Sequence, residues 1–296
     1  MVGGLVLCRA AMASDLESVH KPEAPGVPGT QVVDPLTGLG SYIVRLDVDP
    51  QEVGPEAAHD MVMDALSQTI GTGRSQSIYT YAMVGFSAWM TPEQAADLGG
   101  RPAVALVQPN RWMSMNTERG LETNPNEPSP WNLRRISAPD GLAPDYEPCG
   151  SDGTGVTAVI IDSGFQLDQS QFAGRIREAL SFADTPGGDD AASHGTHVAG
   201  TMAGTGIGVA PACEIVALSV ANANNALSND AILDAIDWLM NPVNMSGPSV
   251  VNMSFSSRRI PGDDGNVFFY PMMQLVRAGY VLVAAAGNDS YPASWA

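Results

Sequence analysis

Ser193-His194-Gly195-Thr196-His197-Val198-Ala199-Gly200-Thr201 is the stretch that decides the fold of this chain. Its small residues predict a helix that can lie close against neighbouring backbone, with His194 in its first turn. An imidazole with an ordinary pKa of about 6.5 suits a general base when its helix begins beside a cleft. Two alternatives are packed histidines without chemistry and a metal pair of His194 and His197. The metal pair lacks further ligands, because only His20 and His59 remain among the histidines.

The composition favours a globular protein with two domains and excludes several partners. The 296 residues are 44% hydrophobic, which is enough for a full core. The formal net charge is -18 and Lys21 is the only lysine, so the surface repels nucleic acid and anionic membranes. No apolar segment reaches the ~18 residues that a membrane-spanning helix needs. We therefore expect neither nucleic acid nor a membrane as a partner.

Residues 1–40 are predicted to be a leader and a linker. Their first part holds a short apolar run that resembles a secretory signal without its basic start, and residues 14–40 are rich in proline and glycine. The three cysteines, Cys8, Cys149 and Cys213, are too few for a disulfide framework. Either Cys149 and Cys213 form a disulfide or Cys213 is a buried strand residue, and we favour the buried residue.

Residues 41–112 are predicted to form a small α+β domain. The apolar alternation at 41–48 indicates a half-buried strand. Thr91-Pro92-Glu93-Gln94 combines a helix cap, a first-turn proline and a capping-box glutamine. The other expected elements are a helix at 55–70 and strands at 77–84, 86–90 and 103–108. The order β-α-β-β-α-β is that of a ferredoxin-like sandwich.

A second chemical group follows a buried strand. The β-branched run at 155–161 is typical of a strand buried on both faces of a parallel sheet. It ends in Asp162-Ser163-Gly164, which places a carboxylate where α/β folds hold their ligands and catalysts. Alone this tripeptide is often just a turn. Together with His194 it makes Asp162 a candidate for the residue that orients a catalytic base.

The rest of the chain alternates strands and helices, as in an α/β fold with a parallel sheet. We expect strands at 213–220, 248–254 and 280–286, and helices at 229–240 and 268–278. The last strand leads to Gly287-Asn288, where the amide of Asn288 could donate a hydrogen bond to a developing oxyanion. The alternative is that Asn288 is only a turn residue.

The histidine stretch, Asp162-Ser163-Gly164 and Asn288 together resemble the blocks of the subtilisin-like serine proteases, in the order of that family. Residues 41–112 resemble its propeptide domain, which serves as a folding chaperone and temporary inhibitor. Residues 131–136 resemble the start of the mature domain in the proteinase K-like branch. Residues 113–130 are polar and are predicted to be an exposed linker. The resemblance implies that the maturation site lies in this linker and that a parallel-sheet peptidase domain follows at 131–296.

The resemblance also implies roles for individual residues. Asp162 orients His194, His194 shuttles the proton, and Asn288 stabilises the oxyanion. Two strand edges receive the substrate as an additional β-strand: Asn225, Ala226 and Leu227 form one, and Ser254, Phe255 and Ser256 form the other. The family has glycines at these edges, whereas Asn225, Leu227 and Ser256 carry side chains. These side chains put the sizes of the primary and distal substrate-specificity pockets in doubt. No organic cofactor is implied; structural calcium is common in the family, but no ligands could be named.

The nucleophilic serine of the family lies in a Gly-Thr-Ser-Met-Ala segment, which the 296 residues do not contain. Ser290 and Ser294 follow Asn288 too closely to take its place. We therefore expect an incomplete peptidase domain, a fragment of a secreted, monomeric serine endopeptidase precursor that does not itself hydrolyse peptides. The expected partners are polypeptide substrates and the chain's own propeptide domain. The alternative is a non-catalytic inhibitor that acts through residues 41–112.

Overall fold

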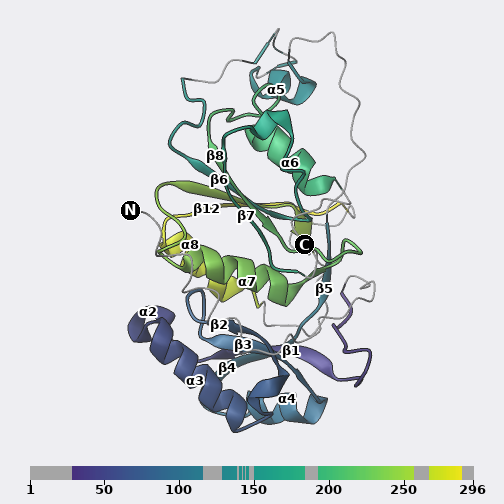
Figure 1. The fold of residues 1–296 in the computed structure, drawn as a ribbon, viewed down its shortest axis with the longest axis vertical. Helices are drawn as coiled ribbons and strands as arrows, with labels where there is room; N and C mark the ends of the chain where they lie inside the picture. Colours follow the sequence, from purple (N-terminus) through teal and green to yellow (C-terminus); the bar gives the residue numbers. More distant parts are fainter. Residues whose placement is uncertain are drawn as a thin grey trace. The chain divides into compact units, whose positions relative to one another are not determined.

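A computed structural model describes residues 29–115, 129–138, 140–141, 143, 145–146, 150–183, 193–256 and 267–288. The described residues belong to two compact units, which are coloured along the sequence in Figure 1. Gln31–Asn110 lie in the first unit, and Arg111 and the residues after it lie in the second. The leader, most of the expected linker, and Cys8 and Cys149 lie outside the described residues.

The first unit is an antiparallel sheet with the order β2-β3-β1-β4. Its strands are β1 (Gly40–Leu46), β2 (Ser75–Tyr79), β3 (Gly85–Met90) and β4 (Val104–Pro109). The helices are α2 (Pro50–Val53), α3 (Pro55–Ser67) and α4 (Pro92–Gly99), with a 3₁₀ turn at Thr72–Arg74. This strand order, with α3 and α4 as the crossovers, is the ferredoxin-like arrangement predicted from the sequence.

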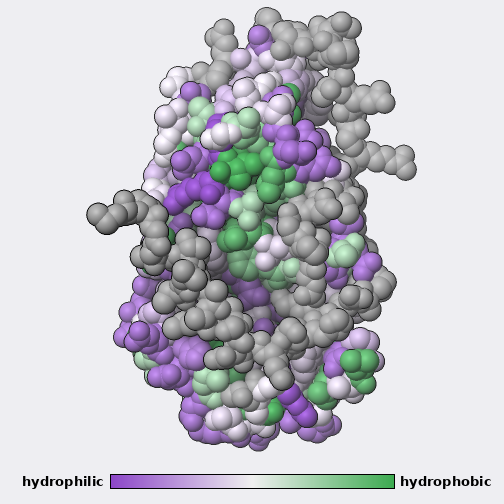
Figure 2. Space-filling model, in the orientation of Figure 1, coloured by the Kyte–Doolittle hydropathy of each residue, from purple (hydrophilic) through white to green (hydrophobic). Residues whose placement is uncertain are grey.

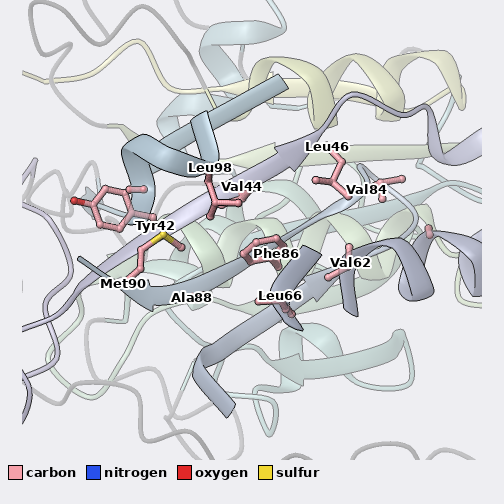
Figure 3. Close-up of a cluster of buried hydrophobic side chains, with 12 residues drawn as sticks. Tyr42, Val44, Leu46, Val62, Leu66, Val84, Phe86, Ala88, Met90 and Leu98 are labelled. Atoms are coloured by element: carbon pink, nitrogen blue, oxygen red, sulfur yellow. The ribbon is translucent and has the colours of Figure 1, made fainter. Parts of the chain in front are cut away.

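The core of this unit lies between the sheet and its two long helices (Figure 3). Alternate residues of β1 point to one face, because side chains along a strand alternate between the two sides of a sheet. Buried residues from β1, β3, α3 and α4 meet there, among them Tyr42, Val44, Phe86, Leu66 and Leu98. Helix α4 begins with the predicted capping box, in which Thr91 and Gln94 bond each other's backbone N–H.

Two predicted elements of the first unit have different bounds in the structure. The expected strand at 77–84 ends at Tyr79, and the residues that follow form a turn. Ala82, Met83 and Val84 are nonetheless buried, so the apolar run that suggested a strand reflects burial without strand pairing. The helix expected at 55–70 ends at Ser67.

The second unit is built on a parallel sheet with the order β12-β10-β6-β8-β7. The strands are β6 (Thr157–Asp162), β7 (Ile176–Ser181), β8 (Glu214–Ser219), β10 (Ser249–Met253) and β12 (Val281–Ala284). The α/β class predicted from the sequence is confirmed. Strand β6 is central and fully buried along its length. The carboxyl end of β6 therefore lies at the same edge of the sheet as the carboxyl ends of its parallel neighbours.

Helices cover both faces of this sheet. Figure 1 shows α6 (His194–Ala203) on one side and α7 (Asn229–Met240) with α8 (Phe269–Arg277) on the other. Ala199 and Ala203 of α6 pack against Ala158 and Ile160 of β6. The short helix α5 (Trp131–Ile136) and a 3₁₀ turn at Ser170–Phe172 precede β7. The small residues of α6 thus let it lie close to the sheet, as expected.

The surface is mostly hydrophilic on the face in Figure 2, with apolar residues exposed between the polar ones. Apolar side chains are also exposed on the last two elements, at Phe269 and Val276 of α8 and at Val281 and Val283 of β12. None of the helices within the described ranges combines the length and hydropathy needed to cross a lipid bilayer.

Candidate active site

The carboxylate of Asp162 and the imidazole of His194 are in direct contact. Nδ1 of His194 lies 2.6 Å from Oδ1 of Asp162. The Asp162 side chain is fully buried and that of His194 is 12% exposed. The same carboxylate oxygen accepts the backbone N–H of Ser163 at 2.7 Å. The structure therefore joins two residues that the sequence singled out from separate motifs.

The first turn of α6 is fixed against the loop that follows Asp162. The backbone N–H of Gly195 donates to Oγ of Ser163 at 3.0 Å, and the N–H of Gln166 donates to Oγ1 of Thr196 at 2.9 Å. A side chain at Gly195 would place its Cβ 2.2 Å from the carbonyl oxygen of Gly164, so only glycine fits there. These contacts determine where His194 lies.

This contact determines which imidazole nitrogen is available for chemistry. A carboxylate only accepts hydrogen bonds, so a neutral His194 beside it carries its proton on Nδ1. Nε2 is then unprotonated and can accept a proton from a nucleophile. The buried carboxylate also stabilises the imidazolium that forms when Nε2 takes that proton. The geometry is that which a general base and its orienting acid require.

The metal alternative finds no support in the described part of the chain. His197 is exposed on α6, whereas the Asp162–His194 contact is buried. Among the described residues, no group of three or more histidine, cysteine, aspartate or glutamate side chains could hold a metal ion. Cys213 is a free, buried thiol next to β8, and burial raises its pKa. This matches the favoured interpretation of Cys213 as a buried residue.

The two expected substrate edges hold an extended segment of the chain itself. Strand β5 (Trp112–Met115) lies between β9 (Leu227–Ser228) and β11 (Phe255–Ser256), antiparallel to both. Trp112 pairs with Ser228 and Met113 with Leu227, while Ser114 and Met115 pair with Ser256 and Phe255. The prediction that 113–130 is an exposed linker is wrong at 113–115. The exposed linker was predicted from the polar composition of the segment, which mostly follows residue 115. Composition does not reveal a short strand that pairs through its backbone.

The loop before β9 explains how the chain manages without a glycine at Asn225. Asn225 has a φ of 58°, a left-handed conformation that asparagine tolerates better than most residues. Oδ1 of Asn222 accepts the backbone N–H groups of Asn224 and Ala226 at 3.0 and 3.1 Å. Leu227 is fully buried. The side chains of Asn225 and Leu227, two of the three that stand at expected glycines, thus fit the local structure.

Comparison with known protein families gives a match for each of the two units. A model of the subtilase family of peptidases matches residues 153–296, which include Asp162 and His194. A model of the peptidase inhibitor I9 family matches residues 41–116, which include most of the first unit and β5. Residues 153–296 belong to the subtilase family. The domain pair of this subtilase is an I9-type domain followed by a peptidase domain.

Several known proteins are similar to this chain in sequence. A subtilisin-like protease of Coccidioides posadasii is 29% identical over 290 residues, 97% of this chain and 69% of that protein. Alkaline serine exoprotease A of Vibrio alginolyticus is 32% identical over 216 residues, 73% of this chain and 39% of that protein. A crystal structure of a cold-adapted subtilisin-like serine proteinase is 31% identical over 56% of this chain and 59% of that one, with a TM-score of 0.48. This subtilase therefore spans only part of the relatives that it matches.

Asn288 of this subtilase lies at the same sheet edge as Asp162. It follows β12, two strands away from β6, and it is exposed in a bend. Gly287 before it has a φ of 88°, so the glycine provides the left-handed turn and Asn288 is not needed for it. Its role as an oxyanion donor stays a prediction.

Sequence reasoning missed β5 and Ser219. Strand β5 is short, and the apolar Trp112 and Met113 at its start were the only signal for it. Ser219 is a polar residue at the end of an otherwise apolar, buried strand, and it lies opposite Asp162 in the sheet. That interruption of an apolar run was visible in the sequence.

Proposed function

We propose that this chain is part of the precursor of a subtilisin-like serine endopeptidase that cleaves peptide bonds by acyl transfer. The contact between Nδ1 of His194 and Oδ1 of Asp162, at 2.6 Å, carries this proposal. It lies at the carboxyl end of the central strand, in the same unit as two strand edges that pair with an extended segment. A peptidase of this type requires a general base and strand edges to which the substrate can add as a further β-strand.

The proposed reaction uses the hydroxyl of a serine in a Gly-Thr-Ser-Met-Ala segment, and these 296 residues do not contain that segment. The serine oxygen attacks the peptide carbonyl while Nε2 of His194 accepts its proton. Asp162 holds the ring and stabilises the imidazolium, and the amide of Asn288 donates to the tetrahedral oxyanion. His194 then gives the proton to the leaving amine. Water repeats the sequence to release the acyl product.

The substrates in this proposal are polypeptides that bind as a strand between β9 and β11. Backbone hydrogen bonds supply most of the recognition, so many sequences are accepted. Residues 225–227 and 254–256 form the two edges. Strand β5 holds this place in the precursor, and the I9-type domain acts as a temporary inhibitor of the peptidase domain. We propose secretion and a monomeric state on the model of extracellular subtilases.

No organic cofactor takes part in this chemistry. The resemblance allows a structural calcium ion without naming its ligands, and the described residues contain no group of three or more acidic, histidine or cysteine side chains that could hold a metal ion. We therefore assign no calcium ligands and route no step through a metal.

The test is to sequence the transcript beyond the codon for Ala296 and to express any longer chain that it encodes. We expect an in-frame Gly-Thr-Ser-Met-Ala-like segment and a product that reacts with a serine-directed phosphonate. His194→Ala in that product should abolish the labelling. A folded longer chain with the serine but without labelling would contradict the proposal.

The inhibitor alternative is the weaker one. An inhibitor that acts only through its first domain gives no reason to keep a buried carboxylate against an imidazole. It does make a separate prediction, because the 296-residue chain would inhibit an active subtilisin without ever forming a phosphonate adduct.

A further inference from the structure

Ser219 is a buried polar residue beside the acid–base pair. It is the last residue of β8 and is fully buried. In the parallel pairing of β6 and β8 it lies directly opposite Asp162. The four residues before it, 215–218, are apolar and buried, as expected inside a parallel sheet. A hydroxyl at this position costs free energy unless it forms a hydrogen bond.

The hydroxyl of Ser219 bonds to the loop that carries the acid. Its Oγ donates to the backbone carbonyl of Ser163 at 2.6 Å. The next residue supports the same loop, because the N–H of Val220 donates to the carbonyl of Asp162 at 2.9 Å. Two successive carbonyl oxygens, those of Asp162 and Ser163, are therefore held by Val220 and by Ser219 at the end of β8.

The side chain of Ser163 extends this connection to the base. Its Oγ accepts the N–H of Gly195, the residue after His194, at 3.0 Å. The hydrogen bonds thus lead from β8 through the loop after β6 to the first turn of α6. Gly195 has no spare room against the carbonyl of Gly164, so a small rotation of this loop moves the helix start.

We propose that Ser219 is a positioning residue for the acid–base pair. Its hydroxyl fixes the Ser163 carbonyl, which sets the direction of the Ser163 side chain and, through Gly195, the place of the His194 ring. The chemical importance of this role rests on the proposed function, whereas the geometric role does not. Ser219 touches neither the substrate nor the reacting atoms, so it acts only through Ser163.

The experiment uses ¹⁵N-histidine NMR on the full 296-residue chain. The readout is the exchange with water of the Nδ1 proton of His194, which opens only when the ring leaves Asp162. We expect Ser219→Ala to speed this exchange by about five-fold, since a neutral hydrogen bond contributes about 1 kcal/mol. Ser249→Ala is the matched control, because Ser249 is buried at the amino end of β10 and bonds the carbonyl of Gly247. It should leave the His194 signal unchanged.

A second pair of variants covers the case in which Ser219→Ala does not fold. Ser219→Thr and Ser219→Val have nearly the same volume and differ in the hydroxyl. We expect the threonine variant to keep the slow exchange and the valine variant to lose it. Equal exchange in these two variants, or wild-type exchange in a folded Ser219→Ala chain, would overturn the positioning role.

The outcomes separate this inference from the proposed function. If Ser219→Ala changes the His194 signal but the extended chain never reacts with a phosphonate, the positioning role holds and the peptidase function fails. If the extended chain reacts with the phosphonate and Ser219→Ala leaves the His194 signal unchanged, the peptidase function holds and the positioning role fails.

Discussion

Gly195 and the carbonyl oxygen of Gly164 are so close that a Cβ on Gly195 would lie 2.2 Å from that oxygen. The same Cβ would lie 3.2 Å from Cβ of Asp162. Because both neighbours belong to the loop that holds the acid, the contact cannot be relieved by turning a flexible side chain. The first turn of α6 and the loop after β6 therefore have one relative arrangement.

Gly195→Ala is expected to destabilise the protein by about 1–3 kcal/mol, as other overpacked sites do. The helix start has to move outward, which separates Nδ1 of His194 from Asp162. Urea unfolding followed by circular dichroism measures the loss of free energy.

The matched control for this variant is Gly200→Ala in the same helix. Its added Cβ would meet only the end of the Ile207 side chain, at 3.2 Å. Alanine is a better helix former than glycine by about 1 kcal/mol, so this variant should be close to neutral. Equal stabilities of the two variants would contradict the tight contact at Gly195.

Trp112→Ala is expected to release β5 from its two neighbouring strands. Trp112 is 7% exposed, and losing a buried tryptophan side chain costs about 3–5 kcal/mol. The variant should therefore be cut by an added protease near residues 112–115 much faster than the wild type. Trp131→Ala is the control, because that tryptophan is 49% exposed and its loss should leave the cleavage rate unchanged. A slow cut in Trp112→Ala would show that the backbone pairing alone holds β5.

Alkaline pH is expected to destabilise the second unit through the buried Cys213 and the half-buried Tyr280. Burial raises the pKa of the Cys213 thiol and of the Tyr280 hydroxyl, whose Oη donates to the carbonyl of Leu239 at 2.8 Å. The unfolded chain releases these protons first, near pH 8.5 for cysteine and about pH 10 for tyrosine. The free energy of unfolding is therefore fully retained below those values and falls as the pH rises through them.

The contribution of each group can be separated by substitution. Tyr280→Phe should lose about 1 kcal/mol at pH 7, the value of its hydrogen bond, and then fall less steeply than the wild type above about pH 10. Cys213→Ala should flatten the earlier part of the fall. Urea midpoints at half-unit pH steps provide the measurement, and a wild-type slope in both variants would refute the assignment.

Asp162→Asn tests the acid in the proposed triad. In a longer, active form of the chain it is expected to lower kcat by about 10⁴, because the amide favours the wrong imidazole tautomer. Burial and shape are almost unchanged, so the unfolding midpoint should move far less than the activity. Activity within ten-fold of the wild type would remove Asp162 from the mechanism.

Much of the framework was predictable because long buried elements leave clear patterns. The run that ends at Asp162 is rich in β-branched residues and forms β6, and the apolar spacing of 229–240 matches α7 at both ends. The cap at Thr91 likewise marked the start of α4. These signals are local, so no knowledge of neighbouring elements was needed to use them.

The parts that escaped prediction depend on neighbours that are distant in the sequence. Strands β9 and β11 have two residues each, too few for any periodicity, and they exist because β5 lies between them. Strand β7 is an edge strand with charged residues, and its side chains are partly exposed on both faces. The pairing of Asp162 with His194 was inferred from their motifs, whereas the connection through Ser219 required the register of β6 against β8.

The acid–base pair also has a consequence for folding. His194 lies 32 positions after Asp162, and the bond between Ser219 and Ser163 closes a loop of 56 positions. Contacts with such separations form only after the intervening chain has been ordered, which makes parallel sheets slow to fold. A partly folded chain that lacks β8 therefore lacks the two hydrogen bonds that hold the backbone at Asp162 and Ser163. A slowly exchanging His194 proton would mark the molecules in which β6, β8 and α6 have already come together.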